Sequence, residues 1–409
     1  MSLRLGRNVA VLVHSTAKLS SSASLSAVSN DEAMKKFRSH ILPNSERLYA
    51  RYGGRQTVTA LPGDGIGPEM MEHIQRIFLF AHVPVDFEVV PIGSSDITDP
   101  EGDLQNVISS IKRNGVALKG NIETKFDNPE FKSRNMEIRR ILDLYANVLH
   151  CVSIPTVPSR HKELDIVMIR ENTEGEYSGH EHEAKKGVVE SLKIVTRDKM
   201  ERITRFAFEY ARTYNRKKIT AVHKANIQKL GDGLFLRCNI KLFSIATEMA
   251  RDEFPDIEFE SMIVDNASMQ LVSKPAQFNG GIMLMPNLYG NIISNIACGL
   301  VGGPGLVSGM NIGEHYAVFE TATRNTGTSL AGQDKANPTA FIRASCDMLT
   351  YLNLSQYADL ISDALFKALT IDKVHTPDIG GTANSSGLVE KVLDHIEVDM
   401  TRLGRKVTH

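Results

Sequence analysis

The chain has 409 residues, of which 42% are hydrophobic, and its 47 Lys and Arg residues nearly balance 48 Asp and Glu residues, giving a formal net charge of −1. This length allows one large domain or two domains of ordinary size. The neutral balance gives no reason to expect nucleic acid or an anionic membrane as the main partner, and no apolar run approaches the roughly 20 residues of a membrane-spanning helix. The cysteines are far apart and form no CxxC pair, which indicates buried thiols in a reducing compartment rather than disulfides or a zinc site: Cys151, Cys238, Cys298 and Cys346.

The N-terminal 30 residues differ in composition from the rest of the chain. They contain no Asp or Glu, three basic residues and many serines, with a few aliphatic residues between them. This composition is typical of a mitochondrial transit peptide. A disordered cytosolic tail is the alternative, and a secretory signal fits less well because the apolar stretch over residues 9–13 is short and interrupted. We therefore expect a transit peptide over residues 1–30, an N-terminal arm over residues 31–54 and a mature protein in the mitochondrial matrix.

After about residue 55, short aliphatic runs alternate with helical patterns. Residues 57–61 predict a strand, which a glycine turn joins to a helix opened by Pro68. The inner side of that helix carries Met70, Met71, Ile74, Ile77 and Phe78. The turn reads GDGIGPE, and a dinucleotide-binding fingerprint would need glycine where Pro68 stands. We interpret this segment as a tight turn rather than a nucleotide site.

The remaining elements continue the alternation of strands and helices. A helix is predicted over residues 196–214, with Thr196 as its cap. Residues 187–196 alternate with period two and predict a strand in an exposed sheet or arm. Further segments predict buried strands and, near the C-terminus, amphipathic helices: strands over 165–169 and 219–222, and helices over 356–371 and 388–396. This order indicates an α/β architecture with a substantially parallel sheet.

Two of the predicted buried strands end in groups suited to chemistry. Arg170 and Tyr177 follow the strand that begins at residue 165, and Lys224 follows the strand that begins at residue 219. Functional groups of α/β proteins collect at such strand ends. An arginine can bind a carboxylate with two hydrogen bonds, and a tyrosine or lysine can take part in proton transfer. The alternative for each residue is a surface ion pair.

A third group combines several kinds of donor within seven residues. Ser133, Asn135 and Arg139 offer a hydroxyl, an amide and a guanidinium, a set that suits a ligand with several carboxylates. Solvated charge on a helix surface is the alternative.

A fourth group concerns a metal. Asn291 and Asn295 are four residues apart, so they share one face of a helix. Two aspartates at these positions would suit Mg²⁺, whereas two amides supply no charge. Asp265 is then the remaining acidic candidate for a metal ligand. The sequence HEHE over residues 180–183 matches no ligand spacing, and we interpret it as a solvated loop.

Taken together, the motifs resemble the β-decarboxylating dehydrogenases, the family of isocitrate and isopropylmalate dehydrogenases. The resemblance extends from about residue 55 to the C-terminus and is carried by GDGIGPE, LDLYANV, IRENTEGEYSG, TAVHKANI, MPNLYG and ANPTA. It implies an α/β fold with two domains sharing a central mixed sheet, a clasp that pairs protomers, and sites built across the subunit interface. The expected large domain covers residues 55–144 and 302–409, and the small domain covers 145–301 with a clasp at about 175–196.

The chain departs from the catalytic members of that family in three places. Those members carry metal-binding aspartates at Asn291 and Asn295, Arg-Pro at Leu149-His150, and His-Gly-Thr-Ala in the cofactor loop where this chain reads TRNTG over 323–327. Loss of all three resembles a regulatory, gamma-type subunit of an NAD-dependent, hetero-oligomeric isocitrate dehydrogenase. The resemblance then implies a catalytic alpha-type partner and a further beta-type subunit, with NAD used by the catalytic partner.

The resemblance also assigns roles to individual residues. It implies that citrate binds as an activator to Thr124, Ser133, Asn135, Arg139, Arg170 and Tyr177. It implies that ADP binds to Asn325, Thr326 and Asn337 in place of the cofactor. Lys224 is expected to assist proton transfer in the partner's active site, and Asp265 to complete its Mg²⁺ or Mn²⁺ shell.

Two other functions remain open from the sequence. A self-sufficient dehydrogenase would need Asn291 and Asn295 to tolerate metal with help from Asp265. A beta-type or purely structural subunit would keep the fold without binding effectors. The altered metal positions favour a regulatory subunit over the first, and the retained carboxylate-binding set favours it over the second.

Overall fold

The computed structural model describes residues 30–41, 54–93, 100–124, 133–236, 249, 253–323 and 325–402. All of the expected transit peptide except Asn30 lies outside these residues, as does Cys238. The other three cysteines are free and buried, as predicted. Within the described part of the chain, no helix is long and apolar enough to cross a membrane.

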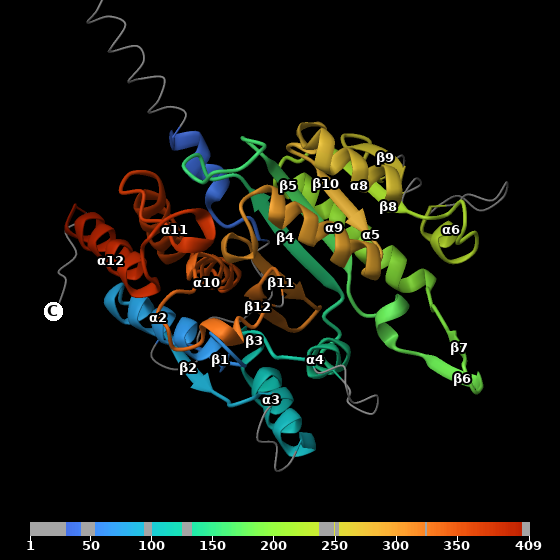
Figure 1. Cartoon of the computed structure of the whole chain (residues 1–409), viewed down its shortest axis with the longest axis horizontal. Helices are drawn as coiled ribbons and strands as arrows, with labels where there is room; N and C mark the ends of the chain where they lie inside the picture. Colours follow the sequence, from blue (N-terminus) through green and yellow to red (C-terminus); the bar gives the residue numbers. More distant parts are fainter. Residues whose placement is uncertain are drawn as a thin grey trace, which may run out of the picture.

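A ten-stranded mixed sheet forms the centre of the molecule (Figure 1). Its strands lie in the order β2-β1-β3-β12-β11-β4-β5-β10-β8-β9. Neighbours are parallel except where β11 meets β12 and β4, and where β4 meets β5. The strands of this sheet are β1 (Gln56–Leu61), β2 (Val85–Val89), β3 (Val116–Lys119), β4 (Ala146–Val152), β5 (Asp165–Glu171), β8 (Lys218–His223), β9 (Glu258–Ile263), β10 (Ile282–Met285), β11 (Ser308–Ile312) and β12 (Ala317–Thr321).

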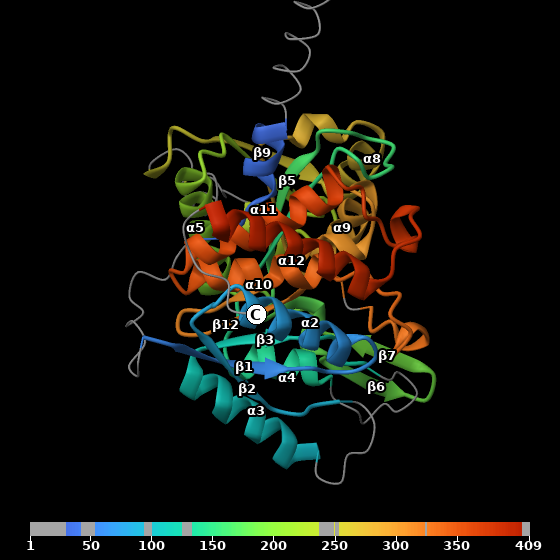
Figure 2. The ribbon, with the colours of Figure 1, turned by 90° about the vertical axis from the view of Figure 1, so that its left-hand side faces the viewer.

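Helices cover the sheet and bury its apolar strands. Near the C-terminus α10, α11 and α12 lie side by side, and α12 and α10 both contact α2 (Figure 2). In the other half, α5 contacts β5, β8 and β10, and α8 packs beside α9. The α-helices are α2 (Gly67–Phe80), α3 (Pro100–Asn114), α4 (Arg134–Ile141), α5 (Arg197–Thr213), α6 (Gly231–Leu236), α8 (Val264–Ser273), α9 (Asn287–Leu300), α10 (Thr339–Tyr351), α11 (Ser355–Thr370) and α12 (Ser385–Arg402). Residues 30–37 form one further helix.

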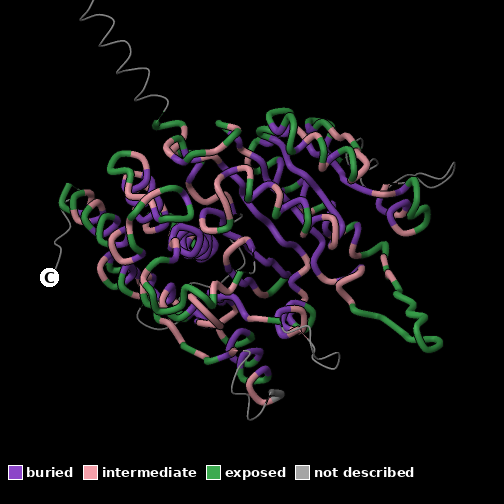
Figure 3. The backbone as a smooth tube through the Cα atoms, viewed as in Figure 1, coloured by how far each residue is buried: buried purple, intermediate pink, exposed green. Residues whose placement is uncertain are grey.

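A separate two-stranded hairpin projects from the body of the molecule (Figure 1). It is formed by β6 (Glu181–Lys185) and β7 (Val188–Ser191), and every residue of both strands is exposed (Figure 3). The exposed strand predicted over 187–196 is confirmed but ends at Ser191. The expectation of a loop at 180–183 is wrong from Glu181 onward, because antiparallel pairing with β7 makes that segment a strand, although a solvated one.

Most other local predictions agree with the structure. The predicted inner face of α2 is buried, and α5 begins one residue after Thr196. The hydroxyl of Thr196 does not cap the helix, because it donates to Glu174 Oε2 at 3.0 Å instead. The 277–282 stretch is anchored by Asn279, whose side chain accepts from the amide of Asp165 at 3.0 Å and donates to the carbonyl of Glu163 at 2.9 Å. It therefore fixes the start of β5.

Candidate functional site

Two arginines predicted from the sequence meet at one asparagine. Arg139 lies in α4 and Arg170 near the end of β5, and both donate to Oδ1 of Asn172, at 3.2 Å and 2.8 Å. Arg139 also donates to Glu320 Oε1 at 2.9 Å. Lys119, at the end of β3, forms an ion pair with the other oxygen of Glu320 at 2.6 Å. The strand ends of both halves of the sheet thus contribute to one buried cluster, which we call the cationic cluster: Lys119, Arg139, Arg170, Asn172 and Glu320.

The cationic cluster holds more positive than negative charge. The cluster contains three cationic side chains, each no more than 5% exposed, and one carboxylate, that of Glu320, which pairs with Lys119 and Arg139. The charges of Glu320 and Glu171 also act on Arg170. Although burial raises the pKa of Glu320, Lys119 and Arg139 outweigh it and hold that pKa at about 2. Burial and the neighbouring charge of Arg139 lower the pKa of Arg170. A buried excess of guanidinium charge is stabilised when an anion binds to it, and carboxylates fit the guanidinium fork.

Arg170 keeps one donor for such a ligand. Its Nε atom is buried and has no hydrogen-bond partner among the described residues. Its stem packs against α9 at Gly290, where a Cβ would lie 2.4 Å from Cγ of Arg170. Only glycine allows the helix to approach this closely, so Gly290 fixes the position of the guanidinium.

The other predicted citrate ligands surround this cluster unevenly. The hydroxyls of Thr124 and Ser133 lie 3.1 Å apart at a more exposed position. The ring of Tyr177 lies 5.7 Å from the guanidinium carbon of Arg170. Asn135 is buried, accepting from Lys119 at 3.1 Å and donating to the carbonyl of Ile122 at 2.8 Å. Its amide therefore supports Lys119 as the cluster now stands.

The two asparagines at the expected metal positions do not fit a divalent cation in this arrangement. Asn291 and Asn295 share a face of α9, as predicted, and the amide of Asn295 donates to the carbonyl of Asn291 at 2.7 Å. Oδ1 of Asn291 accepts from Nη1 of Arg170 at 2.7 Å. An oxygen bound to a guanidinium is a poor ligand for Mg²⁺, which prefers charged carboxylates. These residues thus belong to the environment of Arg170 rather than to a metal site.

Lys224 and Asp265 lie together. Lys224 follows β8, Asp265 lies in the first turn of α8, and their side chains form an ion pair. Large apolar side chains near these two in sequence are exposed: Ile227 by 66%, Leu230 by 89% and Met269 by 56%. Contiguous exposed apolar patches mark protein interfaces, whereas single exposed apolar residues are common on any surface. The Asp265 carboxylate is 67% exposed and pairs with Lys224, so it lies at the surface of this chain.

The predicted nucleotide segment packs against the glycine turn before α2. The carbonyl of Asn325 accepts from the side chain of Asn121 at 2.8 Å, and the carbonyl of Thr326 accepts from the amide of Ile66 at 3.0 Å. Gly65, with φ of 61°, approaches so closely that a Cβ would lie 2.0 Å from the carbonyl oxygen of Thr326. The turn therefore positions this segment, a role that sequence reasoning did not assign to it.

Asn337 lies at the end of the same segment. Its amide donates to Asp378 at 3.0 Å, and its Oδ1 accepts from the amide of Thr339 at 3.0 Å, next to the start of α10. The contacts of Asn325, Thr326 and Asn337 therefore fix the two ends of the segment to different elements.

The Leu149-His150 pair lies within β4. Asn147 is paired with Arg170, and Leu149 with Met168 two residues along the same strands. Leu149 and Asn147 therefore point to one face of the sheet, the face of Arg170. His150 points to the other face, where it bonds to Asp165 at 2.7 Å. An arginine at position 149 would add a cation on the face of the cationic cluster, whereas Leu149 supplies no charge there.

Sequence reasoning missed four members of this network: Lys119, Asn172, Asn311 and Glu320. Lys119 and Glu320 are the charged residues of two otherwise uncharged strands, and Asn311 joins Asn172 at 3.1 Å to Glu320 at 2.8 Å. A charged residue inside a strand that is predicted to be buried is itself a signal, since buried charges are almost always paired.

Comparison with known proteins identifies the fold family. The family model described as isocitrate/isopropylmalate dehydrogenase matches residues 57–393. The chain belongs to this isocitrate/isopropylmalate dehydrogenase family. The predicted fold class is confirmed by two solved structures that are each 36% identical to the chain. They are an isocitrate dehydrogenase from Methylococcus capsulatus, with a TM-score of 0.76 over 83% of this chain and 99% of that one, and the TT0538 protein from Thermus thermophilus, with a TM-score of 0.80 over 85% and 70%.

Several relatives of the chain are named as subunits of a mitochondrial NAD isocitrate dehydrogenase. It is 54% identical to the mitochondrial gamma subunit of NAD isocitrate dehydrogenase from Bos taurus, over 90% of each chain. It is 56% identical to the human gamma subunit, over 85% of this chain and 86% of that one. Identity to the beta subunit from Macaca fascicularis is 46%, over 87% and 90%. The resemblance to gamma-type subunits is therefore confirmed.

Proposed function

We propose that the chain is a regulatory subunit of a hetero-oligomeric, NAD-dependent isocitrate dehydrogenase in the mitochondrial matrix. The complex converts isocitrate to 2-oxoglutarate, and this chain's own cleft binds citrate and ADP without turning substrate over. Its greater identity to gamma than to beta subunits supports the gamma type. The observation that carries the proposal is Asn291, whose amide oxygen bonds to Arg170 at a position where catalytic relatives are expected to hold a metal.

The metal explains why this chain would not be a catalyst alone. In the catalytic partner, a bound Mg²⁺ or Mn²⁺ would polarise a carbonyl oxygen and stabilise developing negative charge. The amides of Asn291 and Asn295 supply none of the charge that would hold such an ion in this chain. Asp265 is exposed and, we propose, completes the partner's metal shell.

Citrate binding is supported by the charge of the cationic cluster. Arg139 and Arg170 are held by Asn172 with an excess of positive charge, and Nε of Arg170 has no partner among the described residues. A tricarboxylate would supply the missing anionic acceptors, with Thr124 and Ser133 as further donors and Tyr177 beside Arg170. Asn135 would act by positioning Lys119 or by exchanging one of its present bonds.

ADP binding is assigned to the segment between Asn325 and Asn337. Thr326 and Asn325 are fixed beside the turn before α2, and Asn337 is fixed at the start of α10. A ligand that bridges these elements would change the position of the intervening segment. Such coupling between an effector site and a shared interface is typically worth about 1–3 kcal/mol.

The subunit interface is assigned to the exposed apolar surface. Ile227 and Leu230, three and six residues after Lys224, are exposed, and the hairpin of β6 and β7 exposes Val188 and Val189. We propose that this surface receives the catalytic alpha-type subunit and that a beta-type subunit completes the assembly. Lys224 would then assist proton transfer in the partner's site, reaching it together with Asp265.

Turnover tests the proposal directly. NAD reduction with isocitrate is measured for the full chain alone and for the chain mixed with its catalytic partner, each with and without citrate and ADP. We expect no turnover by the chain alone and stimulation of the mixture by both effectors. Substantial turnover by the chain alone would refute the regulatory assignment, and a mixture that ignores both effectors would refute effector binding.

A further inference from the structure

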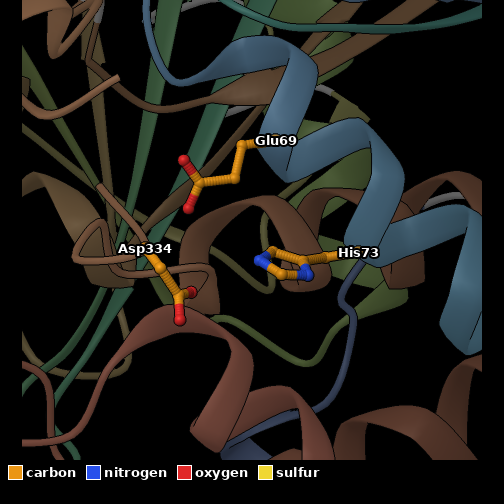
Figure 4. A group of neighbouring side chains, drawn as sticks. All are labelled: Glu69, His73 and Asp334. Atoms are coloured by element: carbon orange, nitrogen blue, oxygen red, sulfur yellow. The ribbon is translucent and has the colours of Figure 1, made fainter. Parts of the chain in front are cut away.

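Three metal-ligating side chains converge at a place that the proposed function does not use. Glu69 and His73 lie on α2, and Asp334 lies in the loop before α10; Figure 4 shows the three side chains pointing toward one another. One ligand atom from each lies within 4.8 Å of the others. We propose that these residues form a binding site for a divalent transition-metal ion, with Zn²⁺ as the ion that fits best. None of the three residues is among those assigned to citrate or ADP, but Asp334 lies in the segment between Asn325 and Asn337 to which ADP binding is assigned.

Two of the three ligands come from one face of α2. Glu69 and His73 are four residues apart on α2, so they share one face. Zinc bonds of 2.0–2.1 Å in a tetrahedral site put ligand atoms about 3.4 Å apart. Side-chain movements of about 1 Å would therefore bring these three atoms to a metal.

The carboxylate oxygens of Glu69 are buried and form no ion pair among the described residues. Both of its oxygens are buried and lack a well-placed hydrogen-bond donor, and neither Glu69 nor Asp334 forms an ion pair with Lys or Arg among the described residues. Burial raises the pKa of Glu69, partly offset by the amide of Gly332, and Asp334 raises it further. Two carboxylates facing each other in this way are stabilised by a cation between them.

The other two ligands are held in place by neighbouring groups. Nε2 of His73 lies 3.1 Å from the hydroxyl of Ser385, and burial lowers the pKa of the ring, which keeps it neutral and able to bind metal. Asp334 accepts from the amide of Ser386 at 2.7 Å. Outer hydrogen bonds of this kind orient metal ligands.

The ligand set selects among metals. One imidazole with two carboxylates suits Zn²⁺ and similar first-row ions, whereas Mg²⁺ and Ca²⁺ prefer oxygen ligands throughout. The bound ion would join α2 to the loop of residues 332–335 and, through Ser385 and Ser386, to the start of α12. Because this loop continues the segment that begins at Asn325, the ion would restrict the movement of that segment.

Calorimetric titration of the full chain with ZnCl₂ tests the site, comparing the native chain with His73→Gln and Asp334→Asn. We expect the native chain to bind one more Zn²⁺ than either variant, or to bind that ion at least tenfold more tightly. His395→Gln is the matched control, because His395 also lies beside an aspartate, Asp372, but outside the site. Equal Zn²⁺ binding by all four proteins would overturn the proposal.

A second measurement separates metal binding from misfolding. Co²⁺ bound through His73 gives visible absorption, which EDTA abolishes, and hydrogen exchange of residues 328–334 should slow when Zn²⁺ is added to the native chain. Glu69→Gln keeps the shape of the side chain and should weaken both effects while the far-ultraviolet spectrum stays native. The proposal would also be overturned if natively folded variants showed both effects at the same metal concentrations as the native chain.

Discussion

Replacing Arg139 by alanine should separate activation from catalysis. Arg139 is 5% exposed and donates to Asn172 at 3.2 Å and to Glu320 at 2.9 Å. A hydrogen bond to a charged group contributes about 1.5–3 kcal/mol, so losing one carboxylate contact should weaken citrate binding about 10- to 150-fold. Basal activity of the complex should remain nearly intact, because the catalytic metal and cofactor belong to the partner.

The same substitution has a cost in stability that can be bounded. Removal of one partner from a buried ion pair typically costs about 3–5 kcal/mol, because a buried charge is left unpaired. Glu320 keeps Lys119 at 2.6 Å and the amide of Asn311 at 2.8 Å, so we expect a smaller loss, about 1–3 kcal/mol. Folded proteins are typically stable by about 5–15 kcal/mol, so the variant should remain folded at 25 °C.

The assay is turnover of the complex against citrate concentration at fixed isocitrate and NAD, with a denaturant melt of each variant. Arg140→Ala is the matched control, because Arg140 is the next residue of α4 and is exposed. Arg139→Ala should shift the citrate midpoint by the stated factor, whereas Arg140→Ala should not. Equal shifts in both variants, or a basal rate that falls with the activated rate, would refute the role given to Arg139.

Three further predictions use different residues. Lys224→Ala should lower the partner's turnover even at saturating effector, because it removes a donated proton-transfer group, while Lys229→Ala, an exposed neighbour, should not. Asn291→Asp combined with Asn295→Asp should tighten Mg²⁺ binding, measured by calorimetry, since two carboxylates replace two amides. Burial, followed by the charge of His150, lowers the pKa of His40 from 6.5 to about 3. The neutral ring therefore stabilises the fold fully above pH 6.5, and the free energy of unfolding should fall by about 2 kcal/mol as the pH drops to 5. Denaturant melts of His40→Gln should lack this fall.

Each of these has a contrary result. Native partner turnover with Lys224→Ala would show that the site is not shared in this way. Unchanged Mg²⁺ affinity in the double aspartate variant would show that the charge at positions 291 and 295 does not limit metal binding. An identical pH slope in His40→Gln would assign acid sensitivity to other groups, of which His150 is the closest buried candidate.

The main elements could be predicted because their apolar patterns are local. The inner face of α2 and the strands that became β5 and β8 are each determined by residues within one turn or one strand. The role of Thr196 could not be predicted in the same way. Its position at the start of α5 follows from the sequence, but its hydroxyl bonds to Glu174, 22 residues earlier, and only the tertiary structure places that carboxylate there.

The candidate site was predictable in its donors but not in their partners. Arg170 could be singled out because it follows a predicted strand, and Arg139 because it lies within seven residues of Ser133 and Asn135. Glu320 could not, because it lies near the end of β12 and contacts Arg139 across 181 residues of sequence. Glu69, His73 and Asp334 were missed for the same reason, since the spacing of four on α2 has a meaning only once the distant loop lies beside it.

The charge of Arg170 connects the loss of catalysis to the gain of regulation. An aspartate at position 291 would neutralise the guanidinium, which donates to Oδ1 of Asn291 at 2.7 Å, and would also hold a divalent ion. An amide accepts the same hydrogen bond without charge, so the positive charge of Arg170 remains for another anion. Arg139 adds to that charge through Asn172. The replacement that weakens a metal site therefore strengthens an anion site at the same arginine, and a pocket that has lost its catalytic ion can become a better sensor of carboxylates.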